Sequence, residues 1–306
     1  MPTNTYVRST KFGKDLDQKF VIESKSACLL DNSLVTDFRG NGKITLADEE
    51  TDGLGNFSKA SGYPQGAVVL NHTDYTLSMD RATRFVLNDQ EVRHTGIDNL
   101  VPGLAGRFIK NHVVPEVDAY TFSKAFAIAN EMGHAESGAN LAEASGNSLE
   151  ITQTLINQCQ DQVGDNEELI AFMNSDFYNG LMHSKDIYRH IDTGDFQKGA
   201  VNTKIKRLNE VPLVKVPGNR MKTAYNFRNG SGEFGFEATD NATNIGCIVL
   251  PRRGALMLIK EIEKTKYFGP ETDDNGDNHR ILFHMFYDAL AKKSRKGTIF
   301  CYTYGN

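Results

Sequence analysis

Two long strand-like segments separated by a polar tip constrain the fold of this chain more than any other feature. The segments are KITLADEE, residues 43–50, and GAVVLNHTDYTLSMD, residues 66–80. The tip between them is dense in Gly, Ser, Asn and Pro, which favour turns and loops. Along the second segment every other side chain points to one face, as in a strand, and those residues are Thr73, Tyr75, Leu77 and Met79. The pattern predicts a long two-stranded hairpin. Because an isolated hairpin is at best marginally stable in water, we expect this one to rest on a neighbouring molecule.

The N-terminal stretch, residues 1–36, is polar and weakly patterned. A short stripe of hydrophobic residues, Phe20, Val21, Ala27 and Leu30, predicts one short helix in an otherwise extended arm. We expect that such an arm cannot bury itself within one subunit.

The stretch NHVVPEVDAYTFSKAFAIAN, residues 111–130, predicts a helix. Pro115 suits the first helical position, and Glu116 and Asp118 then fall in the first turn, where the helix dipole favours negative charge. An acid/base or metal site is the alternative. However, two side chains two residues apart on a helix diverge by about 200°, so we interpret the pair as the start of a helix.

The rest of this helix follows the same periodicity. Its hydrophobic face is predicted to contain Phe122, Ala125, Phe126, Ala129 and Met132, with Gly133 as the C-terminal cap. We expect Phe122 and Phe126 to anchor the helix to a sheet.

Further elements follow in a mixed order. A second helix is predicted over residues 146–164, with Asn147 and Glu150 at capping-box spacing and Gly164 as the stop. The remaining predictions are a buried strand at 168–174, a short helix at 175–184, two strands within 200–217 turning at Asn209 and Glu210, an irregular insertion at 228–241, two strands within 244–261, and a strand at 280–291 paired with one at 297–304 across a basic turn. Strands and helices do not alternate regularly, which favours an α+β fold over a doubly wound sheet.

Composition excludes several classes of protein. The 306 residues are 39% hydrophobic and 24% charged, as in ordinary globular proteins. The net charge of −5 is spread along the chain, without the basic stripe of a sequence-specific nucleic-acid binder. We expect neither a signal peptide nor a membrane-spanning helix. The four cysteines are widely spaced, which predicts free thiols in a reducing compartment.

Motifs that could carry chemistry are weak. GSGEFG, residues 230–235, satisfies G-x-G-x-x-G, but the residues after it are poor helix formers, so we interpret it as a loop. TDDNGDN, residues 272–278, is rich in oxygen ligands, but Leu282 stands where an EF-hand needs glutamate. His279 and His284 are five apart in a probable strand and therefore lie on opposite faces. We expect no catalytic, cofactor or metal site, and hence no enzyme.

Five segments carry a resemblance to a known family. They are GYPQGAVVLNHTDYTLSMDRATRFVLNDQEV, VVPEVDAYTFSKAFAIA, ELIAFMNSDFYNGLMHSKDIYRHI, NEVPLVKVPGNRM and FGPETDDNGDNHRILFHMFYDALAKKSRKGTIF. In this order the chain resembles the major capsid proteins of tailed bacteriophages of the Hong Kong 97 type. PEVDAYTFSKA and HMFYDALAKKSRKGTI are the most specific pieces, and the landmarks cover most of residues 37–304.

The resemblance implies an architecture with named parts. These are an N-terminal arm (1–36), an extended hairpin called the E-loop (37–95), a peripheral domain with a long spine helix from about residue 115 (96–139 and 253–306), and an axial domain (140–252). It implies self-assembly, as hexamers and pentamers, into an icosahedral shell around double-stranded DNA. The expected location is the virion, after assembly in the bacterial host cytoplasm. The expected partners are further copies of the chain, a separate scaffolding protein, a portal, a decoration protein and the packaged DNA, bound without sequence specificity. No membrane and no cofactor are expected.

The candidate residues for assembly or structure lie in these landmarks and at the hairpin tip. They are Lys59, Tyr63, Tyr75, Arg81, Arg84, Pro115, Glu116, Asp118, Phe122, Phe126, Tyr287 and Asp288. Some members of the family join neighbours through a Lys–Asn bond made from the E-loop; we expect Lys59 to solubilise the tip instead. Some members also carry a scaffolding segment before the arm, which we expect a separate protein to supply, unless such a segment has been removed. Two alternatives stay open: an encapsulin-like compartment for a cargo enzyme, and a cytosolic enzyme that binds a nucleotide at GSGEFG.

Overall fold

The computed structural model describes residue 20 and residues 23–31, 35–38, 42–59, 62–94, 100–164, 166–184, 191–198, 201–272 and 276–305. Most of the predicted N-terminal arm and the centre of the TDDNGDN segment lie outside these ranges.

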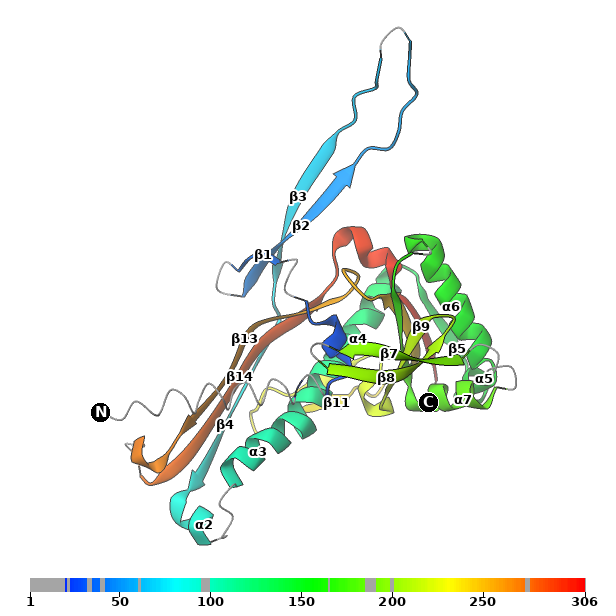
Figure 1. Ribbon diagram of the computed structural model, residues 1–306. Coiled ribbons are helices and arrows are strands. Elements are labelled where there is room, and N and C mark those ends of the chain that lie inside the picture. Colours follow the sequence, from blue (N-terminus) through cyan, green and yellow to red (C-terminus); the bar gives the residue numbers. More distant parts are fainter. Residues whose placement is uncertain are drawn as a thin grey trace.

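A long three-stranded antiparallel sheet forms one side of the molecule (Figure 1). Its strand order is β13–β14–β4, with bounds Met257–Phe268, Asn278–Leu290 and Met79–Asn88. From Ile281 to Tyr287 every second side chain of β14 is buried, namely Ile281, Phe283, Met285 and Tyr287, as the sequence predicts. Such alternation leaves one face of the sheet for packing against helices and the other face for solvent.

The helix that packs on this sheet is longer than the sequence predicts. Helix α3 (Leu100–Phe108) runs through a π-helical turn, η2 (Ile109–Val113), directly into α4 (Val114–Glu131). The α-helix α4 begins at Val114 with Pro115 in its first turn, close to the predicted start. However, the helical backbone already runs through α3 and η2, so Glu116 and Asp118 do not lie at a free helix N-terminus as the dipole explanation requires. A π-turn already disrupts the regular hydrogen-bond ladder, so a residue without an N–H is tolerated there.

The C-terminal end of α4 is as predicted. Gly133 has φ = +76°, a conformation that glycine adopts without strain. His134 N–H donates to the Ala129 carbonyl (2.8 Å) and Gly133 N–H to the Asn130 carbonyl (3.2 Å). These two bonds form a Schellman motif, which satisfies carbonyls that the helix end leaves open.

A seven-stranded sheet forms the second body of the molecule. Its order is β5–β15–β12–β6–β9–β8–β7, with bounds Ala135–Gly138, Phe300–Tyr304, Asn244–Pro251, Leu169–Asn174, Val211–Val216, Val201–Leu208 and Ile191–Lys198. Helices α5 (Leu141–Gly146), α6 (Ser148–Val163) and α7 (Ser175–His183) share a hydrophobic cluster with one face. Helix α4 packs on the other face, in a cluster that continues to β14. One core therefore joins the two sheets.

The predicted pairing of the last two strands is wrong. β14 pairs with β13 and β4, whereas β15 pairs with β12 and β5, and the basic turn η6 (Lys293–Thr298) carries the chain from one sheet to the other. The physical reason is burial. All five residues of β15 are buried, so this strand needs cover on both faces, which only the larger sheet provides.

Several local predictions can be compared directly with the structure. The β8–β9 turn lies at Asn209 and Glu210, as predicted, and both residues have positive φ (+47° and +70°). Gly164 ends α6, as predicted, with φ = +85°. The capping-box bond is absent, since the side chain of Asn147 makes no capping hydrogen bond. The predicted irregular insertion contains a small hairpin, β10 (Tyr225–Phe227) with β11 (Phe236–Ala238).

A third sheet, β1–β2–β3, carries the predicted long hairpin, which projects away from both bodies (Figure 1). Its strands are Val35–Phe38, Lys43–Thr51 and Val68–Thr76. The chain also forms the short helix α2 (Asp89–His94) and the 3-10 turns η1 (Ser26–Leu29), η4 (Gly218–Arg220) and η5 (Pro270–Thr272).

Candidate assembly site

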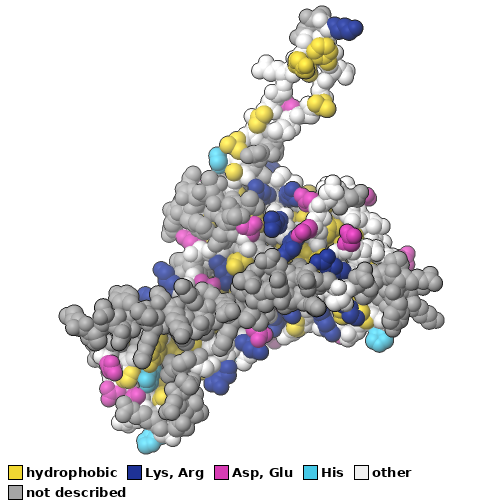
Figure 2. Space-filling model, viewed as in Figure 1, with side chains coloured by type: hydrophobic (Ala, Val, Ile, Leu, Met, Phe, Trp, Pro, Cys, Tyr) yellow, Lys and Arg dark blue, Asp and Glu magenta, His cyan; other side chains and the backbone are white. Residues whose placement is uncertain are grey.

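The outer part of the projecting hairpin exposes large hydrophobic side chains. Leu54 is 107% exposed, Tyr63 89% and Val68 76%, and Phe57 stacks edge-to-face on Tyr63 at 5.2 Å. Figure 2 shows hydrophobic side chains distributed along this projection. Single exposed apolar residues are common, but a row of them on an extended ribbon is typical of a surface that contacts a partner.

Lys59 is exposed at the same tip. A polar hydrogen-bond pair closes the paired strands just below it: Asp52 N–H donates to the Ala67 carbonyl (3.0 Å), and Ala67 N–H donates to the Asp52 carboxylate (2.8 Å). Hydrogen bonds within the hairpin therefore continue up to the tip loop.

The root of the hairpin is buried, in contrast to its outer part. Ile44, Leu46 and Leu77 pack into a hydrophobic cluster with Met257 and Ile259 of β13. Tyr75 and Phe286 lie at the edge of this cluster, partly buried. The sequence predicted the alternation of side chains from Thr73 to Met79 but not which part of the hairpin would be buried.

A buried carboxylate lies where the hairpin meets the long sheet. Asp288, 2% exposed, accepts hydrogen bonds from the Ser78 N–H (3.0 Å), the Ser78 hydroxyl (2.9 Å) and the Tyr120 hydroxyl (2.6 Å). Burial, and secondly the charge of Asp288, raises the pKa of Tyr120 well above its ordinary value. Tyr120 therefore stays protonated and acts as a donor. Tyr287, which directly precedes Asp288, packs edge-to-face on Tyr120, with the ring centroids 5.7 Å apart.

Arg81 and Glu116 form a second link, between β4 and α4. Arg81 Nε lies 2.5 Å from Glu116 Oε1, and Arg81 Nη1 donates to the Arg228 carbonyl at 2.6 Å. This arginine thus connects the long sheet, the helix and the small β10–β11 hairpin. Arg84 is exposed, three residues further along β4.

The GSGEFG segment is the turn of that small hairpin. The strand β11 follows it rather than a helix, so no helix N-terminus is present to bind a phosphate. This geometry contradicts the dinucleotide-site alternative. It confirms the interpretation of the motif as a loop.

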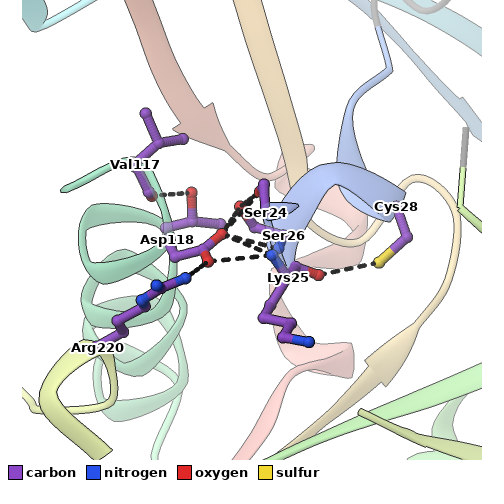
Figure 3. A network of polar contacts seen from close by, with 8 residues as sticks. Ser24, Lys25, Ser26, Cys28, Val117, Asp118 and Arg220 are labelled. Carbon is purple, nitrogen blue, oxygen red and sulfur yellow. Dashed lines mark hydrogen bonds and ion pairs between the residues drawn. The ribbon is translucent and has the colours of Figure 1, made fainter. Parts of the chain in front are cut away.

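Asp118 has a different role from the one predicted. It is fully buried and accepts hydrogen bonds from an N-terminal strap, defined here as residue 20 and residues 23–31 (Figure 3). The donors are the Ser24 hydroxyl (2.8 Å), the Lys25 N–H (3.0 Å), the Ser26 N–H (2.9 Å), the Ser26 hydroxyl (2.7 Å) and Arg220 Nη1 (3.0 Å). Glu116 and Asp118 therefore have separate partners, as their divergence on the helix predicts.

The strap also packs on the long sheet. Phe20 is fully buried beneath Lys260, whose Nζ lies 3.5 Å from the ring centroid, and Asp31 N–H donates to the Leu258 carbonyl at 3.2 Å. The expectation that the arm cannot bury itself within one subunit is wrong for these residues. The hydrophobic stripe predicted a short helix here, and the 3-10 turn Ser26–Leu29 lies within it. The stripe did not indicate the anchor, because Asp118 lies more than ninety positions away in the sequence.

The two predicted phenylalanine anchors differ in burial. Phe122 is 1% exposed and its ring lies 5.0 Å from that of Phe172 in β6, whereas Phe126 is only partly buried. The residues that sequence reasoning missed are Ser24, Ser26, Ser78, Tyr120 and Arg220. Tyr120 could have been noticed from its helical spacing to Glu116, but the others carry no local signal.

The chemistry available in the described residues is limited. The four cysteines are free thiols, as predicted. His279 and His284 each contact a different aspartate, Asp89 (3.0 Å) and Asp80 (2.6 Å). Within the described ranges, no three His, Cys, Asp or Glu side chains gather as a metal site would require. Among the helices described, none has the length and hydropathy of a bilayer span.

Comparison with known proteins gives a clear result only at the level of structure. No protein-family model matches the sequence, and no curated protein matches it significantly. A chain from the asymmetric unit of the bacteriophage PhiM1 mature capsid superposes with a TM-score of 0.58 at 13% identity, covering 91% of this chain and 84% of that one. The capsid of an empty GTA particle gives a TM-score of 0.56 at 12% identity, covering 93% and 90%.

The chain has the Hong Kong 97-type capsid fold. A virus-like particle from Pyrococcus furiosus also matches, with a TM-score of 0.50 at 10% identity over 96% of this chain and 99% of that one. The expected α+β capsid fold is thus confirmed. The likeness is one of fold, since so few aligned residues are identical.

Proposed function

We propose that this protein is the major capsid protein of a tailed bacteriophage, which assembles as hexamers and pentamers into an icosahedral shell around double-stranded DNA. The observation that carries the proposal is the capsid fold combined with a projecting hairpin whose outer hydrophobic side chains are exposed in the described structure. A second copy that covers this hairpin would supply the missing apolar burial. Repeated around a ring, such heterologous contacts close into capsomers.

The parts of the fold are assigned by analogy with the family. The hairpin β2–β3 corresponds to the E-loop, and the segment α3–η2–α4 with the sheet β13–β14–β4 to the spine helix and peripheral domain. The seven-stranded sheet with α5, α6 and α7 corresponds to the axial domain. By the same analogy the protein is structural rather than enzymatic and belongs to the virion, assembled in the host cytoplasm.

Other partners belong to the same proposal. A separate scaffolding protein, a portal, a decoration protein and packaged DNA are the partners that a shell of this type takes. The modest net charge of −5 supports a wall that holds DNA without binding it tightly.

The test is assembly of the purified chain, alone and with candidate scaffolding protein, followed by electron microscopy. Uniform shells or capsomers are expected. The variants Leu54→Asp and Tyr63→Ser should abolish assembly and leave the subunit folded by circular dichroism, because both side chains are exposed in the isolated chain. Leu141→Ser, at an exposed leucine far from the hairpin, is the matched control. A stable monomer under every assembly condition would contradict the proposal.

A protein-filled compartment is the second candidate. The match to a virus-like particle from Pyrococcus furiosus, over nearly the full length of both chains, supports keeping it, because the fold by itself does not determine what the shell encloses. Particle contents decide between the two: nuclease-protected double-stranded DNA supports the virion, and a co-purifying enzyme supports the compartment. Boiled particles that run as monomers on a denaturing gel would confirm that Lys59 forms no cross-link.

A further inference from the structure

The direction in which the hairpin projects is determined at a short joint. Strand β3 ends at Thr76 in the hairpin sheet and β4 begins at Met79 in the long sheet, so only Leu77 and Ser78 connect the two. On the other strand of the hairpin the corresponding residue is Gly42, just before β2. The two sides of the hairpin are joined there by a hydrogen bond from Leu77 N–H to the Gly42 carbonyl, at 2.8 Å.

The backbone at Gly42 is constrained in both conformation and space. Its φ is +71°, which favours glycine, and a β-carbon at this position would lie 2.4 Å from the Phe286 ring. The ring thus packs directly against the backbone of the joint. Leu77, 4% exposed, is buried from the other side.

Asp288 holds the segment that contains Ser78 through Oδ2 and contacts the spine helix through Oδ1. Oδ2 accepts from the N–H and the hydroxyl of Ser78, and Oδ1 accepts from the Tyr120 hydroxyl and from Ala289 N–H at 2.7 Å. The Ser78 and Tyr120 hydroxyls lie 2.8 Å apart and close a triangle with the carboxylate. One buried side chain therefore connects the joint of the hairpin, the spine helix and the long sheet.

We propose that Asp288 is a positioning residue that sets the angle of the hairpin and, through it, the curvature of the assembled shell. The second part of this statement rests on the proposed function. A small change of this angle moves the outer end of the hairpin by a large distance. The nine residues of β3 span about 30 Å at about 3.4 Å per residue, so a rotation of about 10° at the joint moves the far end by about 5 Å.

The first experiment measures the angle itself. Spin labels are placed at two exposed positions, Asn56 at the hairpin tip and Asn157 on α6, in a Cys28→Ser background, and their separation is measured by electron–electron double resonance after dilution with unlabelled chain. Wild type should give one narrow distance distribution. Asp288→Asn should shift or broaden it by several ångströms, because an amide group cannot accept hydrogen bonds at both positions.

Two milder variants keep the test decisive if Asp288→Asn fails to fold. Tyr120→Phe and Ser78→Ala each remove one hydroxyl donor while preserving most of the packing, and each should shift the distribution in the same sense by a smaller amount. Asp118→Asn is the matched control, since it alters a buried carboxylate that accepts hydrogen bonds from five donors, against four for Asp288, and has no hydrogen bond to the joint. A wild-type distribution in Tyr120→Phe and Ser78→Ala, or an equal shift in Asp118→Asn, overturns the proposal.

The second experiment separates this proposal from the proposed function. Particles assembled from Tyr120→Phe or Asp288→Asn chains should differ in diameter from wild-type particles, whereas those of Asp118→Asn should not. Shells of unchanged diameter despite a shifted hairpin would overturn the link to curvature. Failure of the wild-type chain to assemble would instead contradict the proposed function and leave the angle measurement valid.

Discussion

Replacing Asp118 by alanine tests the account of the N-terminal strap. The substitution removes a fully buried carboxylate that accepts hydrogen bonds from two backbone N–H groups, two serine hydroxyls and the Arg220 guanidinium. All of these donors then lack their acceptor. The arginine is the most costly of them, since its side chain is only 17% exposed and stays charged.

The size of the effect follows from the cost of breaking a buried ion pair. Single hydrogen bonds to a charged group contribute about 1.5–3 kcal/mol each, but they share one acceptor and are not additive. Removing one partner of a buried pair costs about 3–5 kcal/mol. We expect Asp118→Ala to lower the free energy of unfolding by about this amount, which is a large part of the total for an ordinary domain.

Two measurements check the expectation. Urea unfolding gives the free energy of unfolding, and hydrogen exchange reports the amides of Lys25 and Ser26, which should lose protection even where the core retains it. Glu131→Gln is the control on the same helix: its side chain is 61% exposed in a pair with Lys296, and such pairs contribute about 0–1 kcal/mol. If Asp118→Ala loses no more stability than this control, or if both amides stay protected, the strap is held by something other than Asp118.

Three further predictions follow from burial and backbone geometry. Phe122→Ala should cost about 3–5 kcal/mol in urea unfolding, and Phe126→Ala clearly less because that ring is only partly buried; equal losses would contradict the assignment of the core face. Burial, with a smaller effect of the Glu167 charge, raises the pKa of the Cys159 thiol to about 12, so the folded chain keeps this proton while the unfolded chain loses it near pH 9. This contribution to stability is complete below about pH 9 and is lost as the pH rises towards 12, by about 1.4 kcal/mol per pH unit. Cys159→Ala should therefore make the decline of the urea midpoint with pH shallower. Identical pH profiles of the urea midpoint in wild type and variant would refute the linkage. Gly42→Ala should destabilise the hairpin root by about 1–3 kcal/mol, seen as faster exchange of the Leu77 amide, and unchanged exchange would show that the joint can relax.

Local elements could be predicted from the sequence where their signal is periodic or depends on one residue type. The alternation from Thr73 predicted a strand of the hairpin, although β3 ends at Thr76 and Met79 begins β4 of the long sheet. The glycines at 133 and 164 predicted two helix ends. The face of β14 with Ile281 and Tyr287 is buried as expected. These signals are local because side-chain direction in strands and helices repeats within a few residues.

The partners of elements far apart in the sequence could not be predicted. Strand β15 pairs with β12 and β5 rather than with its neighbour β14, because complete burial needs cover on both faces. Helix α4 continues from α3 through a π-turn, although Pro115 predicts a helix start. In both cases tertiary packing overrode a local preference.

Hydrophobic periodicity and turn residues by themselves predicted an α+β fold with a long hairpin and a long helix, because these signals repeat within a few residues. The capsid type of that fold was implied only by the resemblance of the ordered motifs to a known family. Only the tertiary structure decided what the buried carboxylates do. Asp118 and Asp288 look alike in the sequence, yet one anchors the N-terminal strap and the other holds the joint of the hairpin. The physical reason is that a buried charge is stable only where donors converge on it, and here all of those donors except Ala289 N–H come from residues 92 to 210 positions away.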